Sequence, residues 1–111
     1  MYEIKKTLEI SAAHKLALDY ESKCKELHGH NWIVTVYLRA RELNAVGMIM
    51  DFTEIKSRIN GKLDHKILND VLDFNPTAEN MARWICEELA PHCYRADVQE
   101  SIGNVASYYV D

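Results

Sequence analysis

The sequence is short of several residue types, and each shortage excludes a class of protein. Only two prolines and four glycines occur in 111 residues, so no Pro/Gly-rich linker separates two domains. We therefore expect a single domain spanning residues 1–111. Basic residues are also few: 13 Lys and Arg stand against 17 Asp and Glu, for a net charge of −4. Such an acidic chain lacks the basic surface that nucleic-acid binding needs.

Long hydrophobic runs are missing as well. The longest apolar stretch, Val46–Met50, falls far short of the roughly 18 residues that indicate a membrane-spanning helix. Residues 1–10 lack the apolar core of a signal peptide. The cysteines are odd in number, three in all, and cannot all pair within the chain. Together these features predict a cytoplasmic protein without a membrane partner.

Histidine, in contrast, is frequent, with five in so small a domain. A small domain buries a smaller share of its surface than a large one, so it gains from a bound metal or from oligomerising. Histidine is also the commonest metal ligand in proteins. The composition therefore directs attention to where the histidines lie in the fold.

Two strands are predicted in the first half of the chain. Residues 2–12 alternate apolar and polar side chains, the pattern of a half-buried strand, and His14 falls on the apolar parity. A second strand is expected over residues 31–41, with Trp32 on its apolar face. Extending that parity backwards puts His28 and His30 on the Trp32 face, unless a β-bulge intervenes.

Two helices are predicted next. The first has Asp51 as its N-cap, Glu54 placed as in a capping box, and Gly61 as its expected end. The second begins at residues 75–77, carries an apolar stripe at helical spacing, and ends before Pro91.

The last segment is typical of a β-hairpin. Its strands are expected at residues 94–99 and 105–110, around a Gly103-Asn104 turn, and Glu100 continues the apolar parity of the first strand. The order strand, strand, helix, helix, strand, strand predicts an α+β domain with a four-stranded antiparallel sheet. Such a sheet has two exposed edges, and pairing between subunits is one way to cover them.

The pattern His28-Gly29-His30 is the first candidate for chemistry. Side chains two residues apart on a strand share a face, so these imidazoles can share one ion. With His14 as a third ligand, the set would match catalytic zinc, which takes three protein ligands and keeps one position open. A histidine pair of this spacing is often incidental, and His14 can equally be a hydrogen-bonded core histidine.

Cys24, four residues before His28, is the candidate base or nucleophile, because a thiol close to a cation loses its proton more easily. Its alternative is an ordinary loop cysteine. Cys86 and Cys93 are interpreted as buried packing residues.

Three further side chains could take part in a reaction. Asp64 precedes His65 and could orient its ring, although neighbours in sequence need not touch. Glu100 lies on an apolar strand face, which is costly for a carboxylate unless it is paired. It either meets a basic side chain or grips a ligand with two parallel N–H donors, such as the edge of guanine or pterin. His92 has no assigned role.

A set of short motifs, in this order, resembles one known family. The motifs are Ser11–His14, Cys24–Asn31, Gly47–Phe52, Leu63–His65, Asn75–Asn80 and Glu100-Ser101. Together they resemble the 6-pyruvoyl-tetrahydropterin synthase / 6-carboxy-tetrahydropterin synthase family over nearly the whole chain. The resemblance implies a tunnelling fold (T-fold), a four-stranded antiparallel sheet with two helices between strands two and three. It also implies a homohexamer of two stacked trimeric barrels, with active sites between subunits.

The resemblance further implies the roles of individual residues. Zn2+ would be held by three histidines, and four other residues would serve the reaction. The metal ligands are His14, His28 and His30; the catalytic residues are Cys24, Asp64 and His65; Glu100 anchors the pterin ring. The implied substrate is 7,8-dihydroneopterin triphosphate.

The three residues between Cys24 and His28 resemble the carboxy branch of the family. That branch makes 6-carboxy-5,6,7,8-tetrahydropterin, with release of acetaldehyde and triphosphate, on the route to queuosine or archaeosine. One alternative is the pyruvoyl branch, which has a longer spacer and eliminates triphosphate without carbon–carbon cleavage. Another is a non-catalytic, zinc-stabilised assembly that binds pterins.

Two positions depart from the family pattern. Ser101 stands where threonine is frequent, and Glu26 lies near the cysteine, where a third subfamily uses a glutamate. Glu26 is interpreted as a solvated loop charge, with an accessory proton role left open. Lys15, next to His14, is a candidate for the triphosphate or a plain surface charge.

Overall fold

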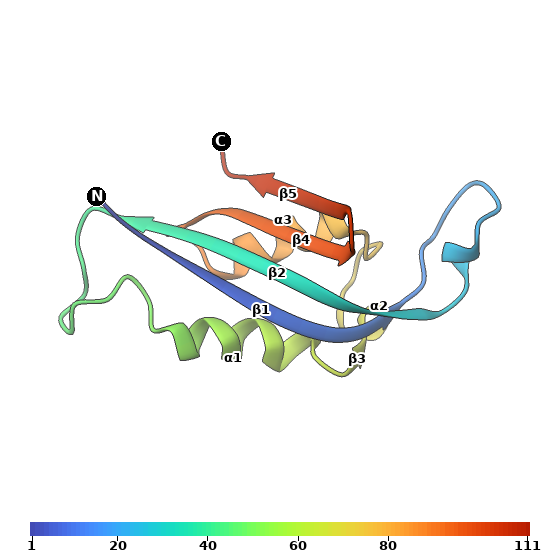
Figure 1. Ribbon diagram of the computed structural model, residues 1–111, viewed down its shortest axis with the longest axis horizontal. Coiled ribbons are helices and arrows are strands. Elements are labelled where there is room, and N and C mark those ends of the chain that lie inside the picture. The colour runs from blue at the N-terminus through green and yellow to red at the C-terminus, as the bar shows by residue number, and fades with distance from the viewer.

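The computed structural model describes residues 1–111, whose strands form one sheet in the order β3-β1-β2-β4-β5 (Figure 1). Neighbouring strands are antiparallel, except that β3 runs parallel to β1. The strands are β1 Tyr2–His14, β2 His28–Ala40, β3 Lys66–Ile67, β4 Cys93–Ser101 and β5 Asn104–Tyr109. This is the expected α+β tunnelling fold, corrected from four strands to five. Strand β3 has only two residues, too few for an alternating pattern to reveal it.

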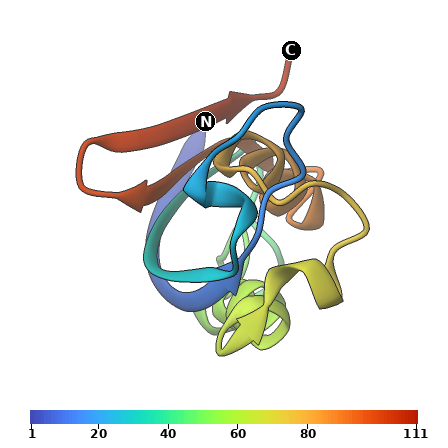
Figure 2. The ribbon, with the colours of Figure 1, turned by 90° about the vertical axis from the view of Figure 1, so that its right-hand side faces the viewer.

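The helices lie between β2 and β4 in the chain and cover one face of the curved sheet (Figures 1 and 2). They are α1 Phe52–Leu63, the single turn α2 Leu68–Val71 and α3 Ala78–Glu88; a 3-10 turn, η1, spans Lys23–Lys25. Twenty buried residues from the helices and the covered sheet face form one hydrophobic cluster, with Trp32 completely buried. No helix combines the length and the apolar character needed to cross a bilayer.

Helix α1 does not end at Gly61, contrary to the prediction. It continues to Leu63, which is fully buried together with Ile55 and Ile59. Burying a leucine contributes about 1.5–3 kcal/mol, which exceeds the cost of about 1 kcal/mol for a glycine inside a helix. Asp51 is the N-cap as predicted, because its carboxylate accepts from the Thr53 N–H at 2.8 Å.

The pairing of β1 with β2 determines where the histidines point. Their ladder runs without interruption from Tyr2 opposite Ala40 to His14 opposite His28, so β2 begins three residues before its predicted start. Because no bulge interrupts this ladder, the parity that puts both histidines of β2 on the Trp32 face holds. The strands β1 and β2 therefore carry the core along most of their length and the histidines at one end.

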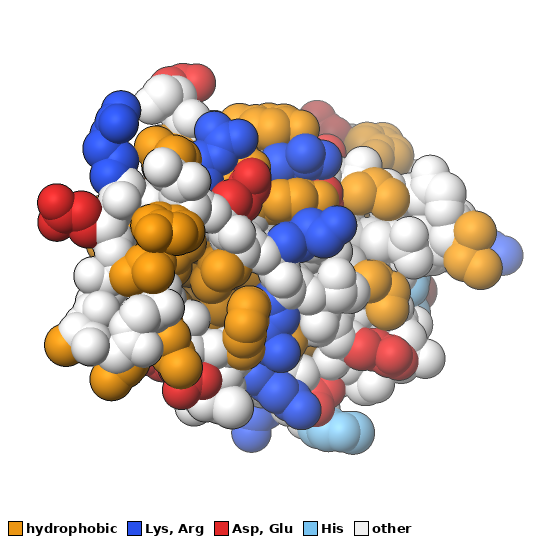
Figure 3. All heavy atoms as spheres, turned by 60° about the vertical axis from the view of Figure 1, so that its left-hand side comes forward, with side chains coloured by type: hydrophobic (Ala, Val, Ile, Leu, Met, Phe, Trp, Pro, Cys, Tyr) orange, Lys and Arg blue, Asp and Glu red, His pale blue; other side chains and the backbone are white.

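The opposite end of these strands exposes hydrophobic side chains. Figure 3 shows them gathered beside lysine and arginine side chains on the face that comes forward in that view. Tyr2, Leu43, Met48 and Phe52 are all exposed there and help to line a cavity of about 220 Å³. The cavity contains none of the predicted site residues.

Candidate active site

Strands β1 and β2 bring three histidines together at their common end. One ligand atom from each of His14, His28 and His30 lies within 4.8 Å of the others, and their ring centroids are 4.6–5.2 Å apart. Trp32 forms the base of the cluster, with its ring centroid 4.9 Å from that of His14. The Trp32 Nε1 donates to the Ala12 carbonyl at 3.2 Å, which fixes the indole in place.

Backbone carbonyls hold two of the three imidazoles. His14 Nδ1 lies 2.8 Å from the Pro76 carbonyl oxygen, and His28 Nδ1 lies 2.7 Å from that of Glu26. A carbonyl only accepts, so each Nδ1 carries the proton and each Nε2 keeps its lone pair. This is the tautomer that presents Nε2 to a metal.

Two of the imidazole Nε2 atoms have no hydrogen-bond partner. The Nε2 atoms of His14 and His30 are buried and make no hydrogen bond. A buried polar nitrogen without a partner is unfavourable, and here the unpaired atoms converge. The donor set, three imidazoles with outer N–H groups of two of them held by carbonyls, therefore fits a bound metal ion.

The electrostatics favour neutral imidazoles. Burial is the main cause that lowers the pKa of His14 and of His30 below the ordinary value. Glu100 acts in the opposite direction, because its carboxylate oxygens lie 3.8 Å from His14 Nε2 and 3.6 Å from His30 Nε2. Since burial outweighs this attraction, both rings stay in the form that can bind a metal.

Glu100 lies at the margin of the cluster, near the end of β4. Its only ion-pair partners are the two histidines, so neither a lysine nor an arginine neutralises it. The carboxylate borders a cavity of about 460 Å³, whose wall includes Leu16, Leu18 and Tyr20. An open cavity beside an unneutralised carboxylate is accessible to a ligand that offers N–H donors.

Cys24 lies in η1, within the loop that connects β1 to β2. Its N–H donates to the N-cap Ser22 Oγ at 3.1 Å, its carbonyl accepts from the Leu16 N–H at 2.8 Å, and its thiol is free and half-buried. Cys86 and Cys93 lie in the core, as predicted. Cys24 is therefore the accessible thiol of the chain, held by its backbone close to the end of β1.

Asp64 and His65 lie at the edge of β1 that faces away from β2, where both form hydrogen bonds to the backbone of Ser11. Asp64 Oδ1 accepts from the Ser11 N–H at 2.9 Å, and the His65 N–H donates to the Ser11 carbonyl at 2.7 Å. His65 adopts a φ of 58°, and its Nε2 lies 3.7 Å from Asp64 Oδ2. The two side chains therefore lie near each other, at a distance longer than a hydrogen bond.

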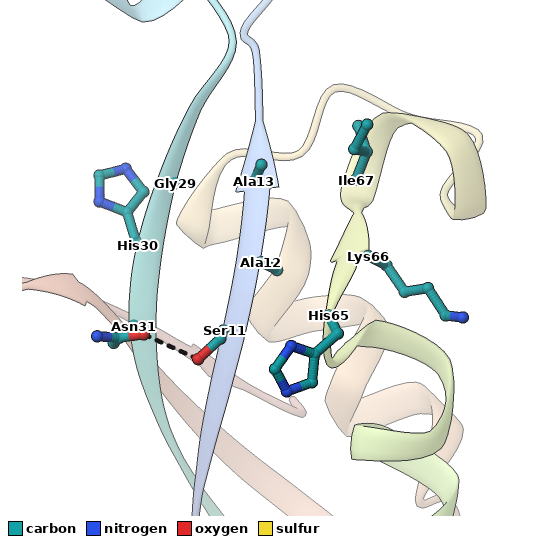
Figure 4. A pocket seen from close by; sticks show the side chains of 9 residues that line it. All are labelled: Ser11, Ala12, Ala13, Gly29, His30, Asn31, His65, Lys66 and Ile67. Carbon is teal, nitrogen blue, oxygen red and sulfur yellow. Dashed lines mark hydrogen bonds between the residues drawn. The ribbon is translucent and has the colours of Figure 1, made fainter.

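No hydrogen bond or ion pair joins this pair to Cys24 or to the three clustered histidines within one chain. The His65 side chain is 82% exposed, and Figure 4 shows it beside Ser11 in a cavity of about 470 Å³. Asn31 and Ser11 are hydrogen-bonded at 2.8 Å on that face. His30 also lines this cavity, but its ring projects from the other side of β2. The structure brings together the histidines and Glu100, whereas neither Asp64 nor His65 bonds to any of them.

The sequence analysis did not identify the groups that support the site through hydrogen bonds involving the backbone. The carbonyls of Glu26 and Pro76 orient two imidazoles, and the side chains of Asn69 and Asn75 bond to the chain beyond His14. A main-chain carbonyl leaves no mark on residue type. Asn75 belongs to one of the motifs that carry the resemblance, but nothing in that motif indicates a bond to Ala17, and Asn69 lies in no motif or periodic pattern.

Comparisons with known proteins agree on one group of enzymes. The family described as 6-pyruvoyl tetrahydropterin synthase matches residues 3–111. The 6-carboxy-5,6,7,8-tetrahydropterin synthase of Synechocystis sp. is 34% identical over 122 residues, which cover 98% of this chain and 94% of that protein. The protein of the same name from Bacillus subtilis is 30% identical over 90% of this chain and 80% of its own length. Among solved structures, the 6-pyruvoyl tetrahydropterin synthase of Caenorhabditis elegans has a TM-score of 0.77 at 25% identity, covering 99% of this chain and 96% of that one.

Proposed function

Because the chain belongs to the 6-pyruvoyl tetrahydropterin synthase family, we propose that it converts 7,8-dihydroneopterin triphosphate to 6-carboxy-5,6,7,8-tetrahydropterin. Acetaldehyde and triphosphate would be released, in a cytoplasmic route to queuosine or a related 7-deazaguanine. The observation that carries the proposal is the three-histidine cluster with the unneutralised Glu100 between it and an open cavity. The names of the two bacterial relatives and the short spacer before His28 support the carboxy product.

Zinc is the ion proposed for His14, His28 and His30, because three neutral imidazoles leave one coordination position open to a substrate. A zinc ion there would polarise oxygen atoms of the substrate side chain and make the neighbouring C–H and O–H groups more acidic. Glu26 would contribute through its carbonyl, by holding the His28 ring in the ligating tautomer.

Glu100 is proposed to hold the pterin ring. An ionised carboxylate accepts two parallel N–H bonds, which the amino-pyrimidinone edge of a pterin supplies. Since its oxygens lie within 4 Å of two ligand nitrogens, a ring held there would keep its side chain close to the metal position. Fixing the ring in this way lowers the entropic cost of bringing the reacting atoms together.

Proton transfer is assigned to Cys24 and to the pair Asp64 and His65. The Cys24 thiolate would remove or relay a proton, and His65, oriented by Asp64, would do the complementary acid–base step. Because His65 is highly exposed and separate from Cys24 in one chain, we propose that it completes the site of a neighbouring subunit. This requires an oligomer, for which the homohexamer of the family is our proposal.

Product analysis with 7,8-dihydroneopterin triphosphate tests the function. A carboxylated pterin and acetaldehyde are the expected products. A pyruvoyl pterin without acetaldehyde would support the second candidate, 6-pyruvoyl-tetrahydropterin synthase. Tight pterin binding without any turnover would instead favour a non-catalytic binding assembly.

Substitution of the thiol tests the mechanism. Cys24→Ala should abolish turnover while the zinc content stays at the wild-type level, because the three ligands lie on β1 and β2. Lys23→Ala, an exposed change in the same turn, is the matched control and should leave turnover intact. Normal turnover in Cys24→Ala would remove the cysteine from the mechanism.

A further inference from the structure

The edge of β1 that faces away from β2 is paired as the strand approaches the histidines. The Ser11 N–H donates to the Asp64 carboxylate at 2.9 Å, and the Ser11 carbonyl accepts from the His65 N–H at 2.7 Å. Two residues further on, Ala13 pairs in parallel register with Ile67 of β3. The segment that follows α1 therefore runs along this edge and satisfies its peptide groups in turn.

Beyond the end of β1, two asparagine side chains take the place that β3 has along this edge. Asn69 accepts from the Lys15 N–H with Oδ1 and donates to the Lys15 carbonyl with Nδ2, both at 2.9 Å. Asn75 does the same at Ala17, with distances of 2.9 and 3.1 Å. A primary amide offers a donor and an acceptor, as a peptide group does, so each side chain acts as one residue of a neighbouring strand. We call each such pair of hydrogen bonds, one to Lys15 and one to Ala17, a clamp.

The residue between the two clamped positions faces the other way. The Leu16 N–H donates to the Cys24 carbonyl at 2.8 Å and so joins the clamped segment to η1. Figure 2 shows the loop of residues 15–27 at the end of the molecule that faces the viewer. The position of Cys24 relative to the histidines therefore depends on where Leu16 is held.

The Asn75 clamp is also connected to the metal ligands. Pro76, the next residue, is the one whose carbonyl accepts from His14 Nδ1 at 2.8 Å. In this short segment, the Pro76 carbonyl thus fixes the His14 ring, and the Asn75 side chain fixes the backbone next to Leu16, which bonds to the Cys24 turn. Neither asparagine touches the cavity beside Glu100, so neither is placed to contact the substrate.

We propose that Asn69 and Asn75 are positioning residues that hold the Cys24 turn at a fixed place beside the three-histidine cluster. The inference rests on the proposed function only for the role given to Cys24. Without the clamps, the segment after His14 would lose its edge pairing, and the thiol would no longer be kept in register with the metal site. A misplacement of about 1 Å at a reacting group can lower kcat as much as 100-fold.

Substitutions to aspartate test the clamps directly. Asn75→Asp and Asn69→Asp keep the acceptor for the backbone N–H but place an oxygen against a carbonyl oxygen, where the amide donated. Asn44→Asp is the chemically matched control, because Asn44 Oδ1 only accepts, from the N–H groups of Val46 and Met48. A carboxylate satisfies both of those bonds.

Three readouts separate positioning from a merely structural role. They are kcat and KM with 7,8-dihydroneopterin triphosphate, the metal content, and the rate at which iodoacetamide alkylates the native protein. Cys24 dominates that rate because Cys86 and Cys93 are buried. In both clamp variants we expect kcat to fall roughly 10- to 100-fold and the alkylation rate to change, with KM, metal content and the melting temperature as in Asn44→Asp.

Wild-type kcat and alkylation rate in both clamp variants would overturn the proposal. A fall of metal content or of melting temperature in parallel with kcat would also overturn it, because the asparagines would then be structural. If Asn75→Asp does not fold, Asn69→Asp, which is not adjacent to Pro76, gives the decisive result. Should the wild type show no turnover, the proposed function fails, while the alkylation rates still test the clamps.

Discussion

Removing the zinc proposed for His14, His28 and His30 should lower the thermal midpoint of unfolding, Tm. The ligands come from two strands separated by a loop, so the unfolded chain has no preformed site. A ligand that binds only the folded state stabilises it by mass action. Chelation therefore withdraws a measurable part of the free energy of unfolding.

The size of the effect follows from the occupancy of the site. At a free zinc concentration about 100 times Kd, binding adds about 2.7 kcal/mol to the free energy of unfolding. A small domain changes its Tm by about 4–8 °C for each kcal/mol. For this chain of 111 residues, we therefore expect chelation to lower Tm by roughly 10–20 °C.

Acid should weaken both the metal-free and the metal-bound protein. Burial lowers the pKa of His14 and His30 in the fold, so below the ordinary value of 6.5 the unfolded chain binds more protons than the folded one. This contribution to the free energy of unfolding is present above about pH 6.5 and is lost as the pH falls below it. The zinc contribution falls in the same direction, because protons compete for the imidazoles.

The measurement is thermal unfolding followed by circular dichroism, with and without EDTA, at about pH 7.5 and about pH 5.5. Protein concentration is held constant, because oligomerisation makes Tm depend on it. His28→Ala is the control, since it removes one ligand from a half-exposed position and should abolish the zinc-dependent shift. An equal zinc-dependent shift in His28→Ala, or none in the wild type, would refute the three-histidine site.

Three further predictions concern single positions. Glu100→Gln should weaken pterin binding about tenfold or more in calorimetric titration, because a hydrogen bond to a charged group contributes about 1.5–3 kcal/mol and the new amide N–H would face an N–H donor of the pterin. Unchanged affinity would exclude Glu100 as the residue that holds the ring. Glu26→Gln should leave zinc content and turnover unchanged, since the carbonyl of Glu26 holds His28, and a loss of turnover would assign its carboxylate a proton role. Gly61→Ala should raise the free energy of unfolding in urea by about 0.5–1 kcal/mol, because the residue lies inside α1 and an added Cβ meets nothing within 4 Å; a lower value would contradict this account of the helix.

The common face of the three histidines was predictable because strand parity is a local property. Once Trp32 is on the core face, His28 and His30 must share it unless a bulge intervenes, and the ladder with β1 has none there. The end of α1 was wrongly predicted because Gly61 is a local signal, whereas the burial of Leu63 depends on tertiary packing.

The surroundings of the site could not be predicted from residue types. The carbonyls of Glu26 and Pro76 orient imidazoles from positions set by the tertiary fold. Likewise, adjacency in sequence indicates that Asp64 and His65 lie near each other, but not that both bond to Ser11 at the edge of β1. That placement depends on which edge of β1 the segment after α1 follows, which only the assembled sheet determines.

Strand β1 bonds to Asp64 and His65 along one edge and carries His14 of the three-histidine cluster on its core face. Its length is therefore constrained in a way that the length of the neighbouring loop is not. Ser11 bonds to Asp64 and His65, and His14 enters the three-histidine cluster only three residues later. Inserting or deleting one residue between them would turn the histidine to the opposite face of the sheet. The loop between Ala17 and Cys24 is fixed at both ends by the Asn75 clamp and the Leu16 bond, so added length there costs only a little loop entropy. The fold of this chain should therefore tolerate an insertion between Ala17 and the N-cap Ser22 at little cost in stability, and it should reject a single-residue insertion in β1.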